Sequence, residues 1–294
     1  MTQAIKTLSF VCARPYWTSG STYLRTFQLA EIAAQRLHSV RVRELAELDE
    51  EISDEVLVFN KSCLRQQFLS GVMERMPALG RRNACLADPI DLLLTDEVLD
   101  RFDGVIAASL GQAEHLASRL SKPVFLIHHH VDIRLTATAK EWNGARAAYF
   151  GELSNTWHAD SLNDLVDFFS VDTTNAIDIP WAQHLPFYNL HYCLRRSRHI
   201  DGFKPATKLF MAASLDAPAV IERSNDEAWR FLPGDYPYYT ESTELDEVRA
   251  MLCRVAETFG KDEWLYAKQS LSAIDCYRQD RVLDSIEGMM RKIS

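Results

Sequence analysis

The chain has 294 residues, 47% hydrophobic and 25% charged, which allows two domains of ordinary globular composition. Its net charge of −9 excludes non-specific binding of nucleic acid through a basic face. Neither a signal peptide nor a membrane span fits the short apolar run before Arg14, and the six cysteines form no C-x-x-C pair. We therefore expect reduced thiols and a cytoplasmic protein, with peripheral contact with a membrane left open.

Strand-like and helix-like segments alternate along the first half. "LSFVCA" is predicted to be a buried strand, and the turn-rich loop "RPYWTSGS" separates it from the first helix. The predicted strands are 8–13, 39–45, 55–60, 83–88, 104–109 and 123–129, and the predicted helices are 22–37, 63–76 and 112–120. Such alternation indicates a mainly parallel sheet, whose ligands bind beyond the carboxyl ends of the strands. Candidate ligand-binding residues therefore lie in 14–21, 60–62, 88–91, 109–112 and 128–132.

The pattern restarts after residues 134–144, where apolar periodicity is weak. We predict two α/β domains, 1–138 and 139–294, with a cleft between them, and such clefts are common small-molecule sites. In the second half the predicted strands are 145–151, 176–180, 190–194 and 218–222, the predicted helices are 160–169 and 205–215, and the end is helical from 243 to 292.

Positive charge is concentrated in "RRSRHIDGFKPATK", residues 195–208. The stretch holds five Arg or Lys residues and one Asp, a local charge of +4. Pro205 fits the first turn of a helix, whose free N–H groups and positive dipole end attract anions. Lys204 and Lys208 can share one helix face, and Arg195 and Arg196 follow a predicted strand. We interpret this stretch as an anion site; the alternative is a solvated basic face.

Three weaker motifs are also candidates. The loop with Ser19, Gly20 and Ser21 offers backbone N–H groups to a polar ligand, although it matches neither a dinucleotide nor a phosphate-loop motif. Asp88 follows a strand and is a candidate acid–base group, with a helix cap or loop carboxylate as the alternative. The histidines in "HHHVD", residues 128–132, point to alternating faces of an extended chain and cannot easily share one ion. We expect no metal site and place these histidines at the hinge.

The second half resembles the donor domain of GT-B glycosyltransferases, similar to the bacterial family 4/1 type. "GFKPATKLFMAASLDAPAVIERS" follows that family's order of basic loop, Pro-x-x-Lys helix start, small-residue helix and Pro-Val-Ile-type strand. The matching residues are Pro205, Lys208, Ala212, Ala213, Pro218, Val220 and Ile221. "YFGELSNTWHADSLNDLVDFF" is similar to the first donor-domain strand and helix, and "DGVIAASLGQAEHLASRLSKPVFLIHHHVD" to the end of the acceptor domain.

The resemblance implies two Rossmann-like domains in the GT-B architecture, with the final helical segment packed back towards the first domain. It also implies transfer of sugar from a nucleotide sugar to a saccharide or lipid-linked acceptor. No metal or other cofactor is expected, in agreement with the lack of a D-x-D motif. The donor diphosphate is expected at Arg195, Arg196, Lys204 and Lys208, and the acceptor near 14–21 and Asp88.

One departure from the family pattern concerns the donor ribose. Where many members have a ribose-binding Glu, this chain has Met211. Glu222 is then a candidate for that contact, or the donor differs. Met211 also supports a second hypothesis, a non-catalytic subunit that binds a nucleotide sugar or a partner glycosyltransferase. A two-domain protein that binds another anion is the third. The sequence does not decide between an inverting and a retaining reaction.

Overall fold

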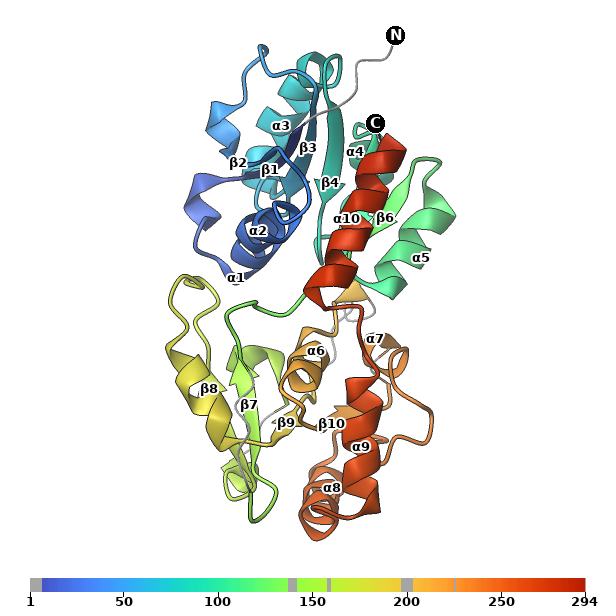
Figure 1. The fold of residues 1–294 in the computed structure, drawn as a ribbon. Coiled ribbons are helices and arrows are strands. Elements are labelled where there is room, and N and C mark those ends of the chain that lie inside the picture. Colours follow the sequence, from blue (N-terminus) through green and yellow to red (C-terminus); the bar gives the residue numbers. More distant parts are fainter. Residues whose placement is uncertain (1–6, 137–141, 158–159, 197–202, 225, 294) are drawn as a thin grey trace.

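The structure is a computed structural model that describes residues 7–136, 142–157, 160–196, 203–224 and 226–293. These residues form two α/β domains, one above the other in Figure 1. Each domain is built on one parallel sheet, as the strand and helix alternation predicted.

The first domain contains a six-stranded sheet in the order β2-β1-β3-β4-β5-β6. Its strands are β1 (Thr7–Cys12), β2 (Val40–Glu44), β3 (Glu55–Asn60), β4 (Ala84–Asp88), β5 (Gly104–Ala107) and β6 (Val124–Leu126). Its helices are α1 (Gly20–Thr22), α2 (Leu29–Ala33), α3 (Gln66–Leu79), α4 (Asp96–Leu99) and α5 (Leu110–Arg119). A π-helical turn, Tyr23–Gln28, joins α1 to α2. The central strands are almost wholly buried because helices cover both faces.

The second domain contains a five-stranded sheet in the order β11-β10-β9-β7-β8. Its strands are β7 (Ala147–Gly151), β8 (Val166–Ser170), β9 (Leu190–Tyr192), β10 (Ala219–Glu222) and β11 (Tyr239–Thr240). Its helices are α6 (Thr207–Ser214), α7 (Asp226–Trp229), α8 (Leu245–Glu257) and α9 (Asp262–Ser272), with a 3-10 helix at Pro180–Phe187. The large apolar cluster of this domain joins α6, α8 and α9 to one face of the sheet.

Two predicted elements of this domain are wrong. The segment predicted as a helix at 160–169 contains a 3-10 turn and then β8. Phe168 packs near Tyr149 and Tyr192, whereas Phe169 stacks on Phe150, so consecutive side chains cover opposite faces as only a strand allows. The strand predicted at 176–180 is a loop that leads into the 3-10 helix at Pro180, and the amide of Ala176 donates to the carbonyl of Thr18 in the first domain (2.7 Å).

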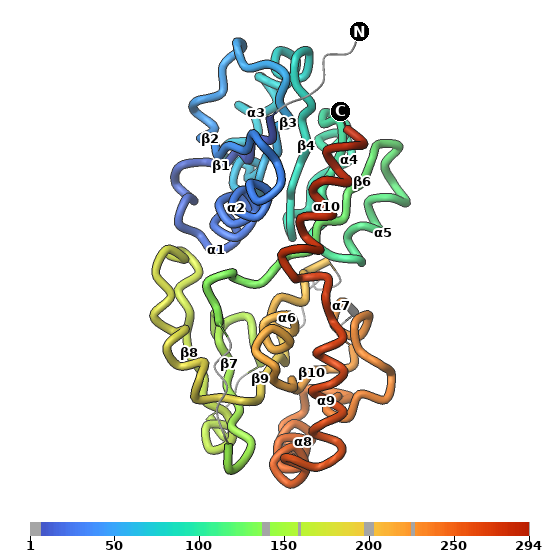
Figure 2. The backbone as a smooth tube through the Cα atoms, viewed as in Figure 1, coloured from blue at the N-terminus to red at the C-terminus, as the bar shows by residue number. Residues whose placement is uncertain are grey.

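The chain end returns to the first domain, as the resemblance implied. Helix α10 (Gln279–Ile293) buries an apolar face, with Val282 and Ile286 fully buried, against α2 and the first sheet. Figure 2 follows this course, with the red C-terminal helix lying among first-domain elements. The predicted second domain, 139–294, therefore includes a helix that belongs structurally to the first. The predicted start of the second domain, at 139, lies in 137–141, outside the described residues.

Contacts between the domains occur on two sides. On one side the loop 171–178 reaches α1: the amide of Gly20 donates to the carbonyl of Thr173 (2.9 Å), and the Thr18 hydroxyl donates to the carbonyl of Thr174 (2.7 Å). On the other side α7 meets the start of α5. There Glu227, 1% exposed, accepts bonds from the amides of Leu110 (2.9 Å) and Gly111 (3.2 Å).

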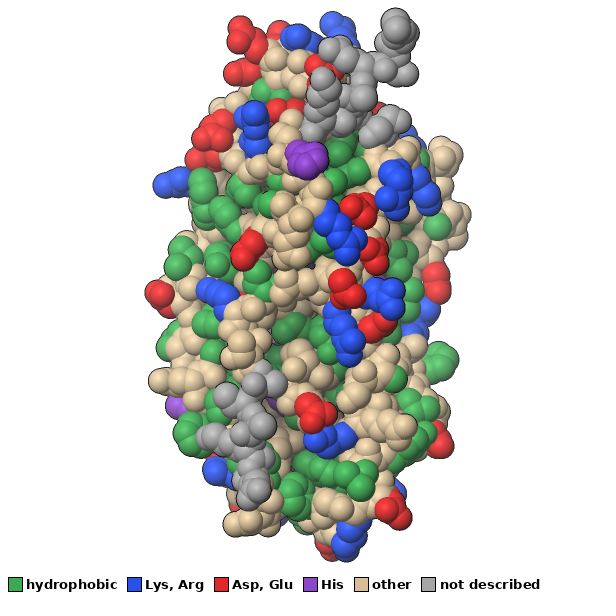
Figure 3. Space-filling model, viewed as in Figure 1, with side chains coloured by type: hydrophobic (Ala, Val, Ile, Leu, Met, Phe, Trp, Pro, Cys, Tyr) green, Lys and Arg blue, Asp and Glu red, His purple; other side chains and the backbone are tan. Residues whose placement is uncertain are grey.

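The surface carries no extended patch of one charge on the face in Figure 3, where basic and acidic side chains are mixed over both domains. All six cysteines have free thiols. Within the described part of the chain, no helix has the length and apolar character needed to cross a bilayer.

Candidate functional site

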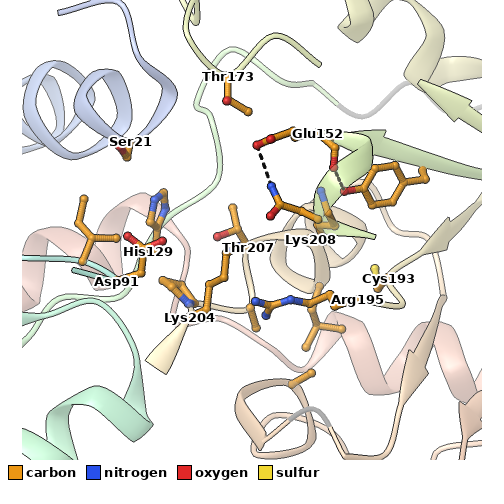
Figure 4. A pocket seen from close by; sticks show the side chains of 18 of the residues that line it. Ser21, Asp91, His129, Glu152, Thr173, Cys193, Arg195, Lys204, Thr207 and Lys208 are labelled. Atoms are coloured by element: carbon orange, nitrogen blue, oxygen red, sulfur yellow. Dashed lines mark hydrogen bonds between the residues drawn. The ribbon is translucent and has the colours of Figure 1, made fainter. Parts of the chain in front are cut away.

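A cavity of about 220 Å³ lies between the domains, at the carboxyl ends of both sheets. The first domain contributes Ser21, Ile90, Asp91 and His129. From the second domain come the ends of β7 and β10, the segment after β9 and the start of α6, including Arg195, Lys204 and Lys208. Figure 4 shows these charged side chains facing a common space. Three of the four cations predicted to bind a diphosphate are thus brought together.

Lys208 lies on the first turn of α6 and reaches the end of β7. Its Nζ donates to the carbonyl of Phe150 (2.8 Å) and lies 4.3 Å from the centre of the Tyr149 ring. Gly151 makes this position possible, because a Cβ there would overlap Nζ and lie 2.8 Å from the Tyr149 hydroxyl. Burial, together with the charges of Arg195 and Lys204, lowers the pKa of Lys208 to about 8.

Of the other three predicted cations, two line the cavity and one does not. Lys204 precedes α6 and lines the cavity with Pro205 and Ala206, so it lies beside the helix N-terminus. Arg195 also lines the cavity, and its backbone bridges to Thr156. Arg196 is exposed and outside the lining, which corrects its assignment. Residues 197–202 of the basic stretch lie outside the described residues.

Asp91 is the first-domain carboxylate that faces these cations. It forms an ion pair with Lys61, and the charges of Lys61 and Lys204 hold its pKa below the ordinary value although burial opposes them. The preceding residue, Ile90, has φ of 61°, a left-handed conformation that is strained for a β-branched side chain. The Gln112 amide donates to the carbonyl of Ile90 and so holds this turn. Strained backbone of this kind concentrates at functional sites.

Asp88 does not reach the cavity, which argues against the catalytic role predicted for it. The side chains of Asp88 and Arg25 are both 0% exposed, and Nε and Nη2 of Arg25 donate to the two carboxylate oxygens at 2.9 and 3.2 Å. Nη1 of Arg25 also donates to the carbonyls of Ile127 (2.8 Å) and His128 (3.1 Å). Asp88 therefore joins the end of β4 to the helix at 20–33 and to the hinge.

The histidines at 128–130 follow the last strand of the first sheet, and His128 contacts Phe210 and Phe231 of the second domain. His129 lines the cavity. Burial and the charge of Arg25 lower the pKa of His129 to about 4, so the ring is neutral at pH 7. Its Nδ1 lies 3.2 Å from the carbonyl of His130, which favours a proton on Nδ1 and a lone pair on Nε2. Among the described residues no three His, Cys, Asp or Glu side chains are grouped as metal ligands.

The predicted acceptor loop contributes one residue to the cavity. Ser21 lines it, whereas the hydroxyl of Ser19 bonds the carbonyl of Tyr16 and the hydroxyl of Thr22. The amide of Gly20 is occupied by Thr173 of the other domain.

Glu222 does not line the cavity, so the predicted ribose contact finds no support here. Met211 packs into an apolar cluster with Ala148 and Phe150. From the second domain, the carboxylate of Glu152 lines the cavity, and its oxygens accept bonds from Ser154 (2.6 Å) and from the amide of Asn155 (2.9 Å).

Sequence reasoning missed Glu152, Asn155 and Thr173. The first two follow β7, and the rule that ligands bind beyond strand ends, applied to the second half, would have found them. No local signal marks Thr173, because it lies in a loop whose position depends on the opposite domain. Asp91 lies in the candidate range 88–91, within which the sequence favours Asp88 because it ends the strand.

No protein-family model and no curated protein sequence matches this chain. Solved structures do. HepE from Anabaena, in complex with UDP and glucose, superimposes with a TM-score of 0.64 at 12% identity, over 97% of this chain and 99% of that one. A glycosyltransferase from Rickettsia africae has a TM-score of 0.62 at 10% sequence identity, over 98% of each chain. Sucrose-phosphate synthase from Thermosynechococcus elongatus has a TM-score of 0.58 at 9% sequence identity, over 98% of this chain and 99% of that one. The chain therefore has the GT-B fold.

Proposed function

We propose that this chain is a glycosyltransferase that takes a sugar from a nucleotide sugar and needs no metal ion. The observation that carries the proposal is the convergence of Arg195, Lys204 and Lys208 on one cavity between the domains. The solved structures of similar fold add support, because HepE was crystallised with UDP and glucose and with UDP-glucose.

The three cations would act on the leaving group. When the bond between the anomeric carbon and the phosphate oxygen breaks, its electron pair stays on the nucleotide diphosphate. Fixed positive charges and the amides at the start of α6 stabilise that developing charge, and this can replace a divalent ion. Lys208, with its pKa of about 8, is mostly protonated at neutral pH and carries the charge that the step needs.

The acceptor hydroxyl would bind at Asp91, which we propose in place of Asp88. Asp91 is ionised, fixed by Lys61 and set across the cavity from the basic side chains. Its carboxylate can accept a hydrogen bond from the attacking hydroxyl and so orient it. The proton goes to Asp91 in an inverting reaction and to the leaving phosphate in a retaining one. Product anomeric configuration, determined by NMR, distinguishes these two courses.

Glu152 is our candidate for the hydroxyl contact that Glu222 cannot make. Its carboxylate lines the cavity on the donor side and is held by Ser154 and Asn155. A carboxylate among cations repels phosphate but accepts hydrogen bonds from sugar hydroxyls, so a ribose or hexose hydroxyl suits it.

Nucleotide binding and sugar release test the proposal. UDP, GDP, CMP and dTDP are screened by thermal shift, and the matching nucleotide sugars are then assayed for transfer or slow hydrolysis, with and without EDTA. We expect one nucleotide to stabilise the protein by about 2.7 kcal/mol at a hundredfold excess over Kd. Asp91→Asn should retain nucleotide binding and lose sugar release. Binding without release from any donor would favour the non-catalytic subunit, and no binding would overturn both hypotheses.

A further inference from the structure

A second hollow, of about 490 Å³, lies on the second domain outside the cavity between the domains. It is formed by the end of β8, the loop 171–178 and the 3-10 helix Pro180–Phe187. Its size falls within the ~300–1,000 Å³ of typical ligand sites. Nothing in the proposed transfer reaction uses it.

Aromatic rings form one wall of this hollow. Phe169 stacks on His184, with ring centres 4.7 Å apart, and on Phe150, with centres 5.0 Å apart and the planes 7° from parallel. Trp181 lies beside Phe150 at 5.8 Å. Since Phe150 belongs to a buried apolar cluster, these rings rest on a rigid base. Rigid aromatic faces are suited to stacking against a flat apolar surface of a ligand.

Polar side chains on the rim complete the site. The carboxylate of Asp178, the amide of Gln183 and the indole N–H of Trp181 belong to residues that line the hollow, and Asp178 also interacts electrostatically with Arg134. Asn175 uses its Oδ1 on the amide of Ile177 (3.2 Å), which leaves its NH₂ group as a donor. Carboxylate, amide and indole groups together offer both acceptors and donors, as a ligand rich in hydroxyl groups requires.

The charge of this hollow differs in sign from that of the cavity. Asp172 and Asp178 line it, and no Lys or Arg of the described residues does. Phosphates and other anions are therefore disfavoured, whereas hydroxyl groups can donate to the carboxylates. The described part of the chain also groups no three potential metal ligands here.

From this combination we propose that the hollow binds a neutral saccharide, with the sugar ring stacked on Trp181 and its hydroxyls bonded by Asp178 and Gln183. Phe169 supports this wall from within, because His184 and Phe150 stack on it. The site does not depend on the chain being a transferase. The same loop links it to the cavity, because Thr173 lines the cavity while Asp172 and Asn175 line the hollow. A saccharide bound here would fix the loop that closes against α1.

Saccharide binding and UDP binding, measured on the same variants, test this inference. Maltotriose, cellobiose, chitotriose and N-acetyllactosamine serve as neutral probes and glucose 6-phosphate as the anionic one, in saturation-transfer NMR followed by titration. We expect at least one neutral probe to bind. The double variant D178A/Q183A should weaken it at least tenfold while UDP binding stays unchanged. Both side chains are exposed, so this variant keeps its fold.

Gln269→Ala, an exposed glutamine on α9 of the same domain, is the matched control and should bind saccharide like the wild type. Trp181→Phe keeps an aromatic face and should lose less affinity than the double variant. The inference is overturned if no neutral probe binds, if D178A/Q183A binds the best probe as the wild type does, or if glucose 6-phosphate binds the hollow better.

Discussion

The charge of Lys208 favours binding of an anionic ligand but lowers the stability of the protein without ligand. Its ammonium group is partly buried against a carbonyl and a tyrosine ring, and among the described residues no carboxylate pairs with it. Burying a cation without a counter-ion is costly, and the lowered pKa of Lys208 reflects that cost. An anionic ligand would supply the missing partner.

Replacing this lysine by an apolar side chain should therefore separate the two effects. We expect Lys208→Met to have a Tm equal to or above that of the wild type without ligand, and to lose most of the rise in Tm caused by the nucleotide diphosphate that the screen selects. A charge-assisted bond is worth roughly 1.5–3 kcal/mol, which corresponds to about a tenfold or greater loss of affinity. Lys261→Met, an exposed lysine before α9, is the control. Equal UDP affinity in Lys208→Met and wild type would contradict the diphosphate site.

The pKa of Lys208 also predicts a pH dependence. It falls from 10.5 to about 8 on folding, so above pH 8 the free protein holds a neutral amine while the unfolded chain still binds the proton. The contribution of Lys208 to stability therefore rises between pH 8 and 10.5. A diphosphate held by Lys208 needs the charged form, so the affinity for the nucleotide selected by the screen should fall about tenfold from pH 7 to 9. Calorimetric titration at several pH values checks this, and Lys208→Met should make the affinity independent of pH. A wild-type affinity that does not change with pH would contradict a role of charged Lys208 in binding.

At the scale of elements, the site depends on how closely the end of β7 approaches the start of α6. Gly151 leaves the space that Lys208 Nζ occupies. We expect Gly151→Ala to fold, since its backbone is not in the left-handed region, but to displace both the ammonium group and the Tyr149 ring and to weaken UDP at least tenfold. Gly234→Ala, where a Cβ meets nothing within 4 Å, is the matched control. A Gly151→Ala protein with normal UDP affinity would place the phosphates elsewhere.

The sequence predicted elements well where burial alone determines them. Runs such as "EVLVFN" are buried on both faces of a parallel sheet, so composition identifies them. β8 was missed because its residues alternate between two aromatic layers that belong to distant parts of the chain. The loop 171–178 was missed because its backbone partners lie in the first domain.

The site was predicted in part for similar reasons. Proximity to a strand end identified Arg195, and the predicted helix start identified Lys208, but neither signal shows which way each side chain points. Adjacent residues on an extended chain face opposite directions, so Arg195 lines the cavity while Arg196 is exposed. Asp88 is the last residue of its strand, and its buried carboxylate pairs with Arg25. The left-handed turn at Ile90 then directs the chain so that Asp91 faces the cavity. Such a turn has no clear signal in "ADPID".

At the scale of the whole molecule, the size of the cavity conflicts with the size of its proposed ligand. About 220 Å³ is below the ~300–1,000 Å³ of typical ligand sites, and a nucleotide sugar is not small. The two groups of contacts between the domains hold this closed arrangement. We therefore expect the domains to separate when the donor enters, and the buried carboxylate of Glu227 to be the strongest single contact opposing separation.

Comparing two carboxylates on the same side of the molecule tests this expectation. Glu227 is 1% exposed and bonds two amides at the start of α5, where the helix dipole favours a negative charge. Glu114 pairs with Arg230 at 2.7 Å, but its side chain is 64% exposed, and such pairs contribute little. Glu227→Gln should therefore increase the radius of gyration of the free protein in X-ray scattering, and Glu114→Gln should not. Because opening becomes easier, UDP should also associate faster with Glu227→Gln in stopped-flow experiments. If both variants scatter and bind like the wild type, α7 does not hold the domains closed, and the loop 171–178 becomes the contact to examine.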